Sequence, residues 1–185
     1  SSIIITFAIP LFFGLILIEF FYGVITKQNN YRINDAITSM SLGLISRFVP
    51  ILGLGFQYVV YKAVAEHYNF NLLNGEEVWV WVTAFVLYDV CYYWMHRIHH
   101  EIKVFWATHV VHHHGEEFNL STALRQTSTG FLWKWVFFLP MFIIGIPPHI
   151  YVSVAGLNLV YQFWVHTEHI GRLGFLEYIF VTPSN

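Results

Sequence analysis

The chain has 185 residues, of which 56% are hydrophobic and only 11% are charged, and its formal net charge is −2. A soluble domain carries about 25% charged residues, so this composition excludes a domain that covers a water-exposed surface by itself. The small negative charge excludes the basic field that nucleic acid requires, and the single cysteine excludes an internal disulfide.

Three long apolar runs follow one another in the first half of the chain, at residues 3–25, 36–61 and 78–95. A helix needs about 20 predominantly apolar residues to cross the hydrocarbon core of a bilayer, so each run predicts a membrane-spanning helix. The second run is interrupted by Arg47 and Pro50. The three runs together indicate an integral membrane protein.

Two shorter apolar runs, at residues 131–146 and 150–166, come later in the chain and are joined through Pro147 and Pro148. Two consecutive prolines favour a tight reversal between helices. We therefore predict a helical hairpin here. The complete pattern predicts an all-α fold, a single membrane-embedded helical bundle over residues 1–185.

The charges on the connecting segments predict the orientation of the bundle. Three successive spans place residues 26–35 and 96–130 on one side of the membrane and residues 62–77 on the other. Lys and Arg prevail on the first side, whereas residues 62–77 contain one lysine and three glutamates. The positive-inside rule therefore places residues 96–130 in the cytoplasm, and the hairpin returns His166 to that same side.

Seven of the 11 histidines are concentrated between residues 96 and 114. Most of them are three or four positions apart, so on a helix they share a face. Neutral imidazole is a common ligand of transition metals. A closed structural site needs about four ligands, so the larger number of histidines here suggests two ions. The predicted ligands are His96, His100, His109, His112, His113 and His166.

The other five histidines receive weaker roles or none. His169 is a weaker candidate ligand, whereas His99 and His114 lie off the shared faces, where orienting or surface roles compete with ligation. His67 and His149 are assigned no role. Because the sequence has no Cys-x-x-Cys pair, thiolate zinc sites and iron–sulfur clusters are excluded. Iron, zinc, copper and nickel remain.

Two acids and three polar residues are further candidates for the site. Asp89 lies inside an apolar run, where an acid needs a partner. It either orients a histidine, which is the interpretation we favour, or pairs with Arg47. Glu101 directly follows His100, and its carboxylate would ligate a metal or orient an imidazole. The alternative is that Glu101 is a solvated glutamate on the surface. The candidates for binding a polar headgroup or a reductant are Asn119, Arg125 and Gln126.

The spacing H-x3-H followed by H-x2-H-H occurs together with the stretches YYWMHRIHHEI, NLSTALRQ and QFWVHTE. This combination resembles the first two histidine boxes of the fatty acid hydroxylase/sterol desaturase superfamily, in particular the alkylglycerol monooxygenase branch and its bacterial homologues. The resemblance is strong over residues 85–185. It implies a membrane-bound, non-haem oxygenase with two iron ions that hydroxylates or desaturates a lipid. For this branch it implies an ether glycerolipid as substrate and a tetrahydropterin as electron donor.

The superfamily has a third box, H-x2-H-H, which in this branch comes just after a T-P-S segment. Residues 182–185 of this chain read Thr-Pro-Ser-Asn. We therefore expect the third box to begin beyond Asn185, and the oxygenase domain to lack its C-terminal part here.

Three other functions compete with an ether-lipid oxygenase. One is a desaturase or hydroxylase of the same superfamily that acts on a sterol, a carotenoid or a fatty acid. Another is a membrane protein that binds or transports metal, for which histidines and acids spread along the spans are expected. The third is a haem-binding electron carrier, which needs facing histidines on separate spans. The position of the histidines at one helix end favours the oxygenase.

Overall fold

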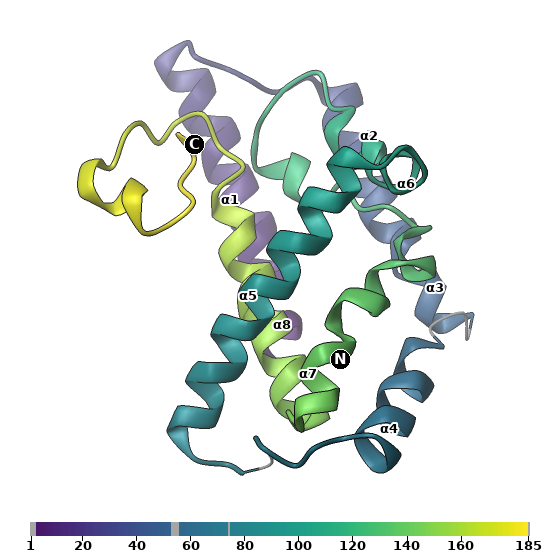
Figure 1. Ribbon diagram of the computed structural model, residues 1–185. Coiled ribbons are helices and arrows are strands. Elements are labelled where there is room, and N and C mark those ends of the chain that lie inside the picture. Colours follow the sequence, from purple (N-terminus) through teal and green to yellow (C-terminus); the bar gives the residue numbers. More distant parts are fainter. Residues whose placement is uncertain (1–2, 53–55, 74, 185) are drawn as a thin grey trace.

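The computed structural model describes residues 3–52, 56–73 and 75–184, and every regular element in these ranges is helical (Figure 1). Two of the described helices are long and apolar enough to cross a membrane. They are α1, Ile3–Thr26, and α5, Val78–Glu101. These helices correspond to the first and third predicted spans, so the all-α bundle with membrane-spanning helices is confirmed.

The second apolar run forms three successive helices, so the prediction of one span over residues 36–61 was wrong in detail. These helices are α2, Ile33–Ser46, α3, Phe48–Ile51, and α4, Gln57–His67. The break after Ser46 has a simple cause, because Pro50 has no N–H to bond the carbonyl four residues before it. The three helices still lead from one end of the bundle to the other (Figure 1). Residues 53–55 of the predicted span lie outside the described residues.

The predicted hairpin is present, although its first arm is irregular. That arm consists of η2, Gly130–Leu132, η3, Lys134–Phe138, and α7, Leu139–Ile144. Gly145 ends α7 with a φ of 107°, a conformation that favours glycine. The second arm is the continuous helix α8, Pro148–Trp164. Figure 1 shows the reversal at the end of the bundle opposite α6, so α8 runs back toward the histidine end.

Shorter elements at the histidine end connect the long helices. They are α6, Lys103–His113, and the 3-10 helix η1, Leu120–Leu124, while η4, Gly174–Tyr178, follows α8. Asn119 starts η1 with a capping box, in which its side chain accepts from the backbone N–H of Ser121. The Asn119 amide also donates to the carbonyl of Asn30, and the Asn30 amide donates to the carbonyl of Phe118, which holds the loop after α6 against the segment between α1 and α2.

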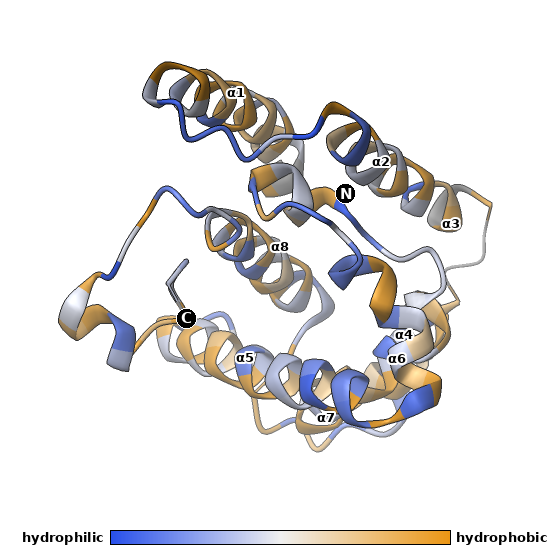
Figure 2. Ribbon diagram, turned by 90° about the horizontal axis from the view of Figure 1, so that it is seen from above, coloured by the Kyte–Doolittle hydropathy of each residue, from blue (hydrophilic) through white to orange (hydrophobic). Residues whose placement is uncertain are grey.

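Helix α8 lies at the centre of the bundle, between α1 and α5 (Figure 2). Phe163 of α8 stacks on Phe12 of α1 with ring centroids 4.0 Å apart. On its other side α8 contributes Ile150 to a buried cluster that includes Phe142 of α7 and Tyr61 of α4. Many large apolar side chains on the outer faces of α1 and α5 are exposed, as expected of helices that face lipid.

Candidate metal centre and adjoining cavity

A sharp corner between α5 and α6 brings four of the predicted ligands together. The one residue between the helices, Ile102, has an extended backbone with φ −109° and ψ 122°. Its N–H still closes the last turn of α5 by donating to the carbonyl of Ile98 at 3.0 Å. The chain therefore changes direction without fraying either helix. The four histidines on the two sides of this corner are His96, His100, His109 and His113, which we call the corner group.

The corner group directs its ring nitrogens at a common centre. One nitrogen from each ring lies within 4.8 Å of the others. The Nε2 atoms of His96 and His100 are 3.1 Å apart, and so are those of His109 and His113. Such close rings repel one another when protonated, whereas a metal ion binds them all in the deprotonated state. The donor set therefore fits a transition metal.

The surroundings keep the rings of α6 in the form that binds metal. Burial, followed by the neighbouring imidazoles, lowers the pKa of His113 to about 4. Burial likewise lowers the pKa of His109 to about 2, with smaller contributions from His96 and Lys134. Both rings are therefore neutral at neutral pH and can offer a lone pair to a metal.

His112 lies beside the corner group but is turned toward the end of α8, where its Nε2 is 3.4 Å from Nε2 of His166. Nδ1 of His112 bonds the carbonyl of Arg125 at 2.9 Å, and Nδ1 of His166 bonds the carbonyl of Gln162 at 2.7 Å. A carbonyl only accepts, so each Nδ1 carries the proton and each Nε2 keeps its lone pair. His112 and His166, which we call the second pair, therefore offer two further metal ligands.

A cavity of about 450 Å³ adjoins both histidine groups, and most of its lining is apolar. Its volume falls within the range of about 300–1,000 Å³ typical of small-molecule sites. His109, His112 and His166 form part of its wall, and the rest comes mainly from α1, α2, α5 and α8. A long apolar molecule in this cavity would therefore lie against the candidate metal ligands.

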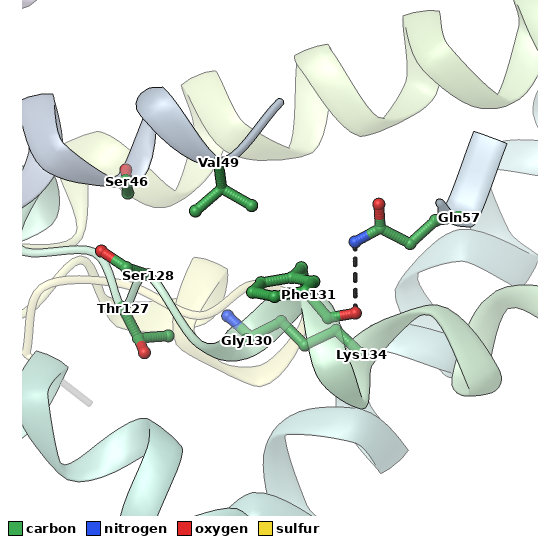
Figure 3. Close-up of a pocket in the computed structure, with 8 residues that line it drawn as sticks. All are labelled: Ser46, Val49, Gln57, Thr127, Ser128, Gly130, Phe131 and Lys134. Carbon is green, nitrogen blue, oxygen red and sulfur yellow. Dashed lines mark hydrogen bonds between the residues drawn. The ribbon is translucent and has the colours of Figure 1, made fainter. Parts of the chain in front are cut away.

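A smaller pocket of about 200 Å³ meets the cavity at Thr127 and Lys134, which line both spaces. Figure 3 shows the Lys134 side chain extending toward Thr127, and Gln57 donating to the carbonyl of Phe131 at 3.3 Å. Within the described ranges Lys134 makes no hydrogen bond or ion pair. Its amine therefore lies without a partner in the described part of the chain, where the smaller pocket meets the cavity.

The sequence model of one family, described as fatty acid hydroxylase, matches residues 81–185, more than half of the chain. The chain belongs to the fatty acid hydroxylase family. The matched region starts within α5 and includes both histidine groups. The resemblance seen in the sequence is therefore confirmed.

Relatives extend this similarity over nearly the whole of this chain. Alkylglycerol monooxygenase of Danio rerio is 41% identical over 179 residues, which are 96% of this chain and 40% of the relative. The human enzyme of the same name is 40% identical over 179 residues, with the same two shares. The Caenorhabditis elegans enzyme is 31% identical over 169 residues, 90% of this chain and 33% of the relative. The chain thus spans about two fifths of the length of the first two relatives. No solved structure matches it significantly.

In this member of the fatty acid hydroxylase family, the six predicted ligands lie in two adjoining groups, and their ligation of metal stays a prediction. The weaker candidate His169 lies apart, against Tyr22 of α1, with ring centroids 5.1 Å apart. His99 is fully buried, and its Nδ1 bonds the carbonyl of Met95 at 2.7 Å. His114 is exposed at the end of α6.

Of the three residues predicted to bind a headgroup or a reductant, only Gln126 lines the cavity. Arg125 is buried and donates to Asp35 Oδ1 at 2.6 Å and to Ser39 Oγ at 3.1 Å. Asn119 is also buried; its amide donates to the carbonyl of Asn30 at 2.8 Å, and its oxygen accepts within the cap of η1. These bonds give Arg125 and Asn119 a structural role, and their binding of a headgroup or a reductant stays a prediction.

Among the described residues, neither of the two predicted acids bonds a candidate metal ligand. Asp89 is exposed, and in the described part of the chain it has no hydrogen bond or ion pair with a histidine or with Arg47. Asp89 lies two turns before His96 on the same face of α5, and its orienting role stays a prediction. Glu101 is exposed and pairs with Arg97 at 2.8 Å, one helical turn back, which is the solvated arrangement that competed with ligation.

A catalytic role for Glu101 stays a prediction that one pair of variants tests. If the carboxylate turns inward to a metal, Glu101→Gln lowers turnover at least tenfold more than Arg97→Met, which removes only its surface partner. We expect this difference because an exposed ion pair contributes little by itself. Turnover and bound metal, measured on both variants in membranes, decide the question. Equal effects of the two changes would assign Glu101 to the surface alone.

Glu19 is a residue of the site that the sequence prediction missed. It is buried in α1, and its carboxylate accepts from the Tyr31 hydroxyl, from the Leu120 N–H at 2.8 Å and from the Thr167 hydroxyl. These bonds tie α1 to η1 and to the segment that begins with His166. Its signal in the sequence was a lone acid inside an apolar run, which is costly unless it has partners.

Proposed function

We propose that this chain is the portion of a membrane lipid monooxygenase that holds most of the metal ligands and the lipid cavity. The observation that carries the proposal is that His109, His112 and His166 stand in the wall of a largely apolar cavity. The substrate we favour is an ether-linked glycerol lipid, which the names of the relatives support. The reaction inserts one atom of O2 into a C–H bond and reduces the other to water.

The metal proposed for this site is iron, as two ions. The corner group would hold one ion, and the second pair would contribute to the other, with further ligands from a third histidine box after residue 185. Bound iron would supply the redox chemistry that O2 activation requires and that zinc lacks. Six histidine nitrogens without a thiolate suit iron, and their arrangement as four plus two supports two ions rather than one.

The residues of the chain have three tasks in this proposal. The carbonyls of Arg125 and Gln162 hold the second pair with Nε2 free for metal. The apolar side chains of the cavity bind the hydrocarbon part of the lipid and exclude water from the reacting carbon. The corner at Ile102 fixes the corner group relative to the cavity, so that metal and lipid meet in one place.

The balanced reaction also needs two electrons and two protons from a donor. We propose a tetrahydropterin, which the resemblance to the alkylglycerol monooxygenase branch implies. The cavity and the smaller pocket of Figure 3 are two spaces near the histidines that could receive a reductant.

The competing functions differ in what they require of the structure. A metal transporter needs ligands spread along the spans, whereas the candidate ligands gather at one end of the bundle (Figure 1). A desaturase of the same superfamily would use the same site, so the product must distinguish it from a hydroxylase.

The test is turnover by the full-length protein in membranes supplied with 18O2, a tetrahydropterin and an alkylglycerol. We expect one 18O atom per oxidised lipid, no product without O2, and iron in the purified protein. An unlabelled alkene product would show that the protein is a desaturase and not a monooxygenase. Bound iron with no oxygen-dependent product from ether lipids, fatty acids or sterols would overturn the proposal.

The proposed orientation, with the histidines on the cytoplasmic face, has its own test. In a Cys91→Ser background, cysteines placed at Lys27 and Lys103 should react with an impermeant thiol reagent only from the cytoplasmic side. A cysteine at His149, on the hairpin turn, should react only from the opposite side. All three positions are exposed. Labelling of Lys27→Cys and Lys103→Cys from different sides would contradict the topology.

A further inference from the structure

One face of α8 carries a row of polar side chains into the otherwise apolar cavity. Asn158 and Gln162 are four residues apart on α8, so they lie one above the other on the same face, and His166 follows two residues after the helix ends at Trp164. All three line the cavity, together with Tyr92 of α5. The row thus leads from a candidate metal ligand into the space proposed for the lipid.

The hydrogen bonds along this row have a fixed direction. The Tyr92 hydroxyl donates to Gln162 Oε1 at 2.8 Å, and Gln162 Nε2 in turn donates to Asn158 Oδ1. In each of the two amides the oxygen therefore accepts the bond that comes from the Tyr92 side, and the nitrogen is left to donate further along the row. The row ends at the Asn158 Nδ2 group, whose N–H groups have no acceptor among the described residues.

A purely structural role does not account for Asn158. The bond between Tyr92 and Gln162 already joins α5 to α8, and Asn158 lies on the same helix as Gln162, so it joins nothing further. Asn158 is only 5% exposed to solvent and lines the cavity, and an amide N–H group that a bound apolar chain covers without offering an acceptor costs free energy. A ligand in the cavity that carries an acceptor oxygen would remove this cost.

We propose that Asn158, oriented through Gln162 and Tyr92, is a substrate-binding residue that donates to an oxygen atom of the lipid. This inference rests on the proposed function and deepens it, because it names a lipid with an ether or hydroxyl oxygen and excludes a plain hydrocarbon. The rise of α8 places Asn158 about 9 Å along the axis from Trp164, the last residue of the helix, and His166 follows two residues later. The bound oxygen therefore lies within about two turns of the metal end and determines which carbon reaches it.

The test compares the binding of two radiolabelled lipids to the full-length protein in detergent micelles, an alkylglycerol and an alkane of similar chain length. We expect Asn158→Leu to raise the Kd of the alkylglycerol about fivefold to tenfold, the effect of one neutral hydrogen bond. The Kd of the alkane should stay unchanged or fall. Leu159→Val is the matched control, because Leu159 also lines the cavity but has no polar group, and it should weaken both lipids alike.

A second variant covers the case in which Asn158→Leu does not fold. Tyr92→Phe removes the hydroxyl that orients Gln162 and should lower the preference for the alkylglycerol at least twofold. The inference is overturned if either folded variant keeps the full wild-type preference, or if Asn158→Leu weakens both lipids equally. If the variants lose the preference for the alkylglycerol but the wild-type protein oxidises neither lipid, Asn158 still binds the lipid oxygen. That result would overturn the monooxygenase proposal instead.

Discussion

Replacing His112 by alanine in the full-length protein should abolish oxygen-dependent lipid turnover and lower the bound iron. The change removes one Nε2 from the second pair, whose separation of 3.4 Å marks a place for a shared ion. It also leaves the carbonyl of Arg125 without the imidazole that it orients. Loss of a metal ligand leaves a gap that no neighbouring side chain fills, so turnover should fall below detection. Iron content and 18O incorporation, measured on the same preparations, check the prediction.

His149 provides the control for this experiment. Its ring is exposed at the hairpin turn, at the end of the bundle opposite the second pair, where Nε2 lies 2.8 Å from Glu76. His149→Ala should keep turnover within about twofold of the wild type, because an exposed pair of this kind contributes little to stability. Equal activity of His112→Ala and His149→Ala would remove the catalytic interpretation of the histidines.

Replacing Asp35 by alanine should lower the free energy of unfolding by roughly 3–5 kcal/mol, the cost of breaking a buried ion pair. The side chains of Asp35 and Arg125 are 12% and 4% exposed, and they pair at 2.6 Å. Without Asp35 the guanidinium keeps its charge in a buried place. Because the backbone carbonyl of Arg125 holds His112, the same change should also weaken metal binding. Denaturation in detergent, with iron content before unfolding, measures both effects.

Two comparisons sharpen the Asp35 experiment. Glu66→Gln breaks an exposed pair with Lys62, 3.8 Å apart, and should change the free energy of unfolding by less than about 0.5 kcal/mol. The double variant Asp35→Leu with Arg125→Met removes the uncompensated charge and should recover part of the lost stability. If Asp35→Ala is no more destabilising than Glu66→Gln, the pair does not anchor the site.

Local sequence patterns were sufficient to predict which candidate ligands lie together on one helix face. The spacing of four between His96 and His100, and again between His109 and His113, determines which rings share a helix face. What spacing could not predict is that Ile102 alone makes the corner that turns the two faces toward each other. The division into corner group and second pair depends on this turn, so it appeared only in the structure.

Residues whose partners are distant in the sequence were harder to assign. Arg125 is polar and close to the histidines, which favoured a role in binding, but its partner Asp35 lies 90 positions earlier. Glu19 binds residues 101 and 148 positions later, so no local pattern could reveal its three partners. The missing N–H of Pro50, in contrast, has a purely local consequence, and the interruption of the second run was visible in the sequence.

The Ile102 corner also has a consequence for the order in which the protein assembles during synthesis. All ligands of the corner group come from one continuous stretch of 18 residues, so this group can close as soon as α6 has emerged and met α5. The second pair joins residues 54 positions apart, and the whole hairpin must first be made and folded back. Closing a longer loop costs more entropy and comes later in folding. We therefore expect a nascent chain to capture its first metal ion before the lipid cavity exists.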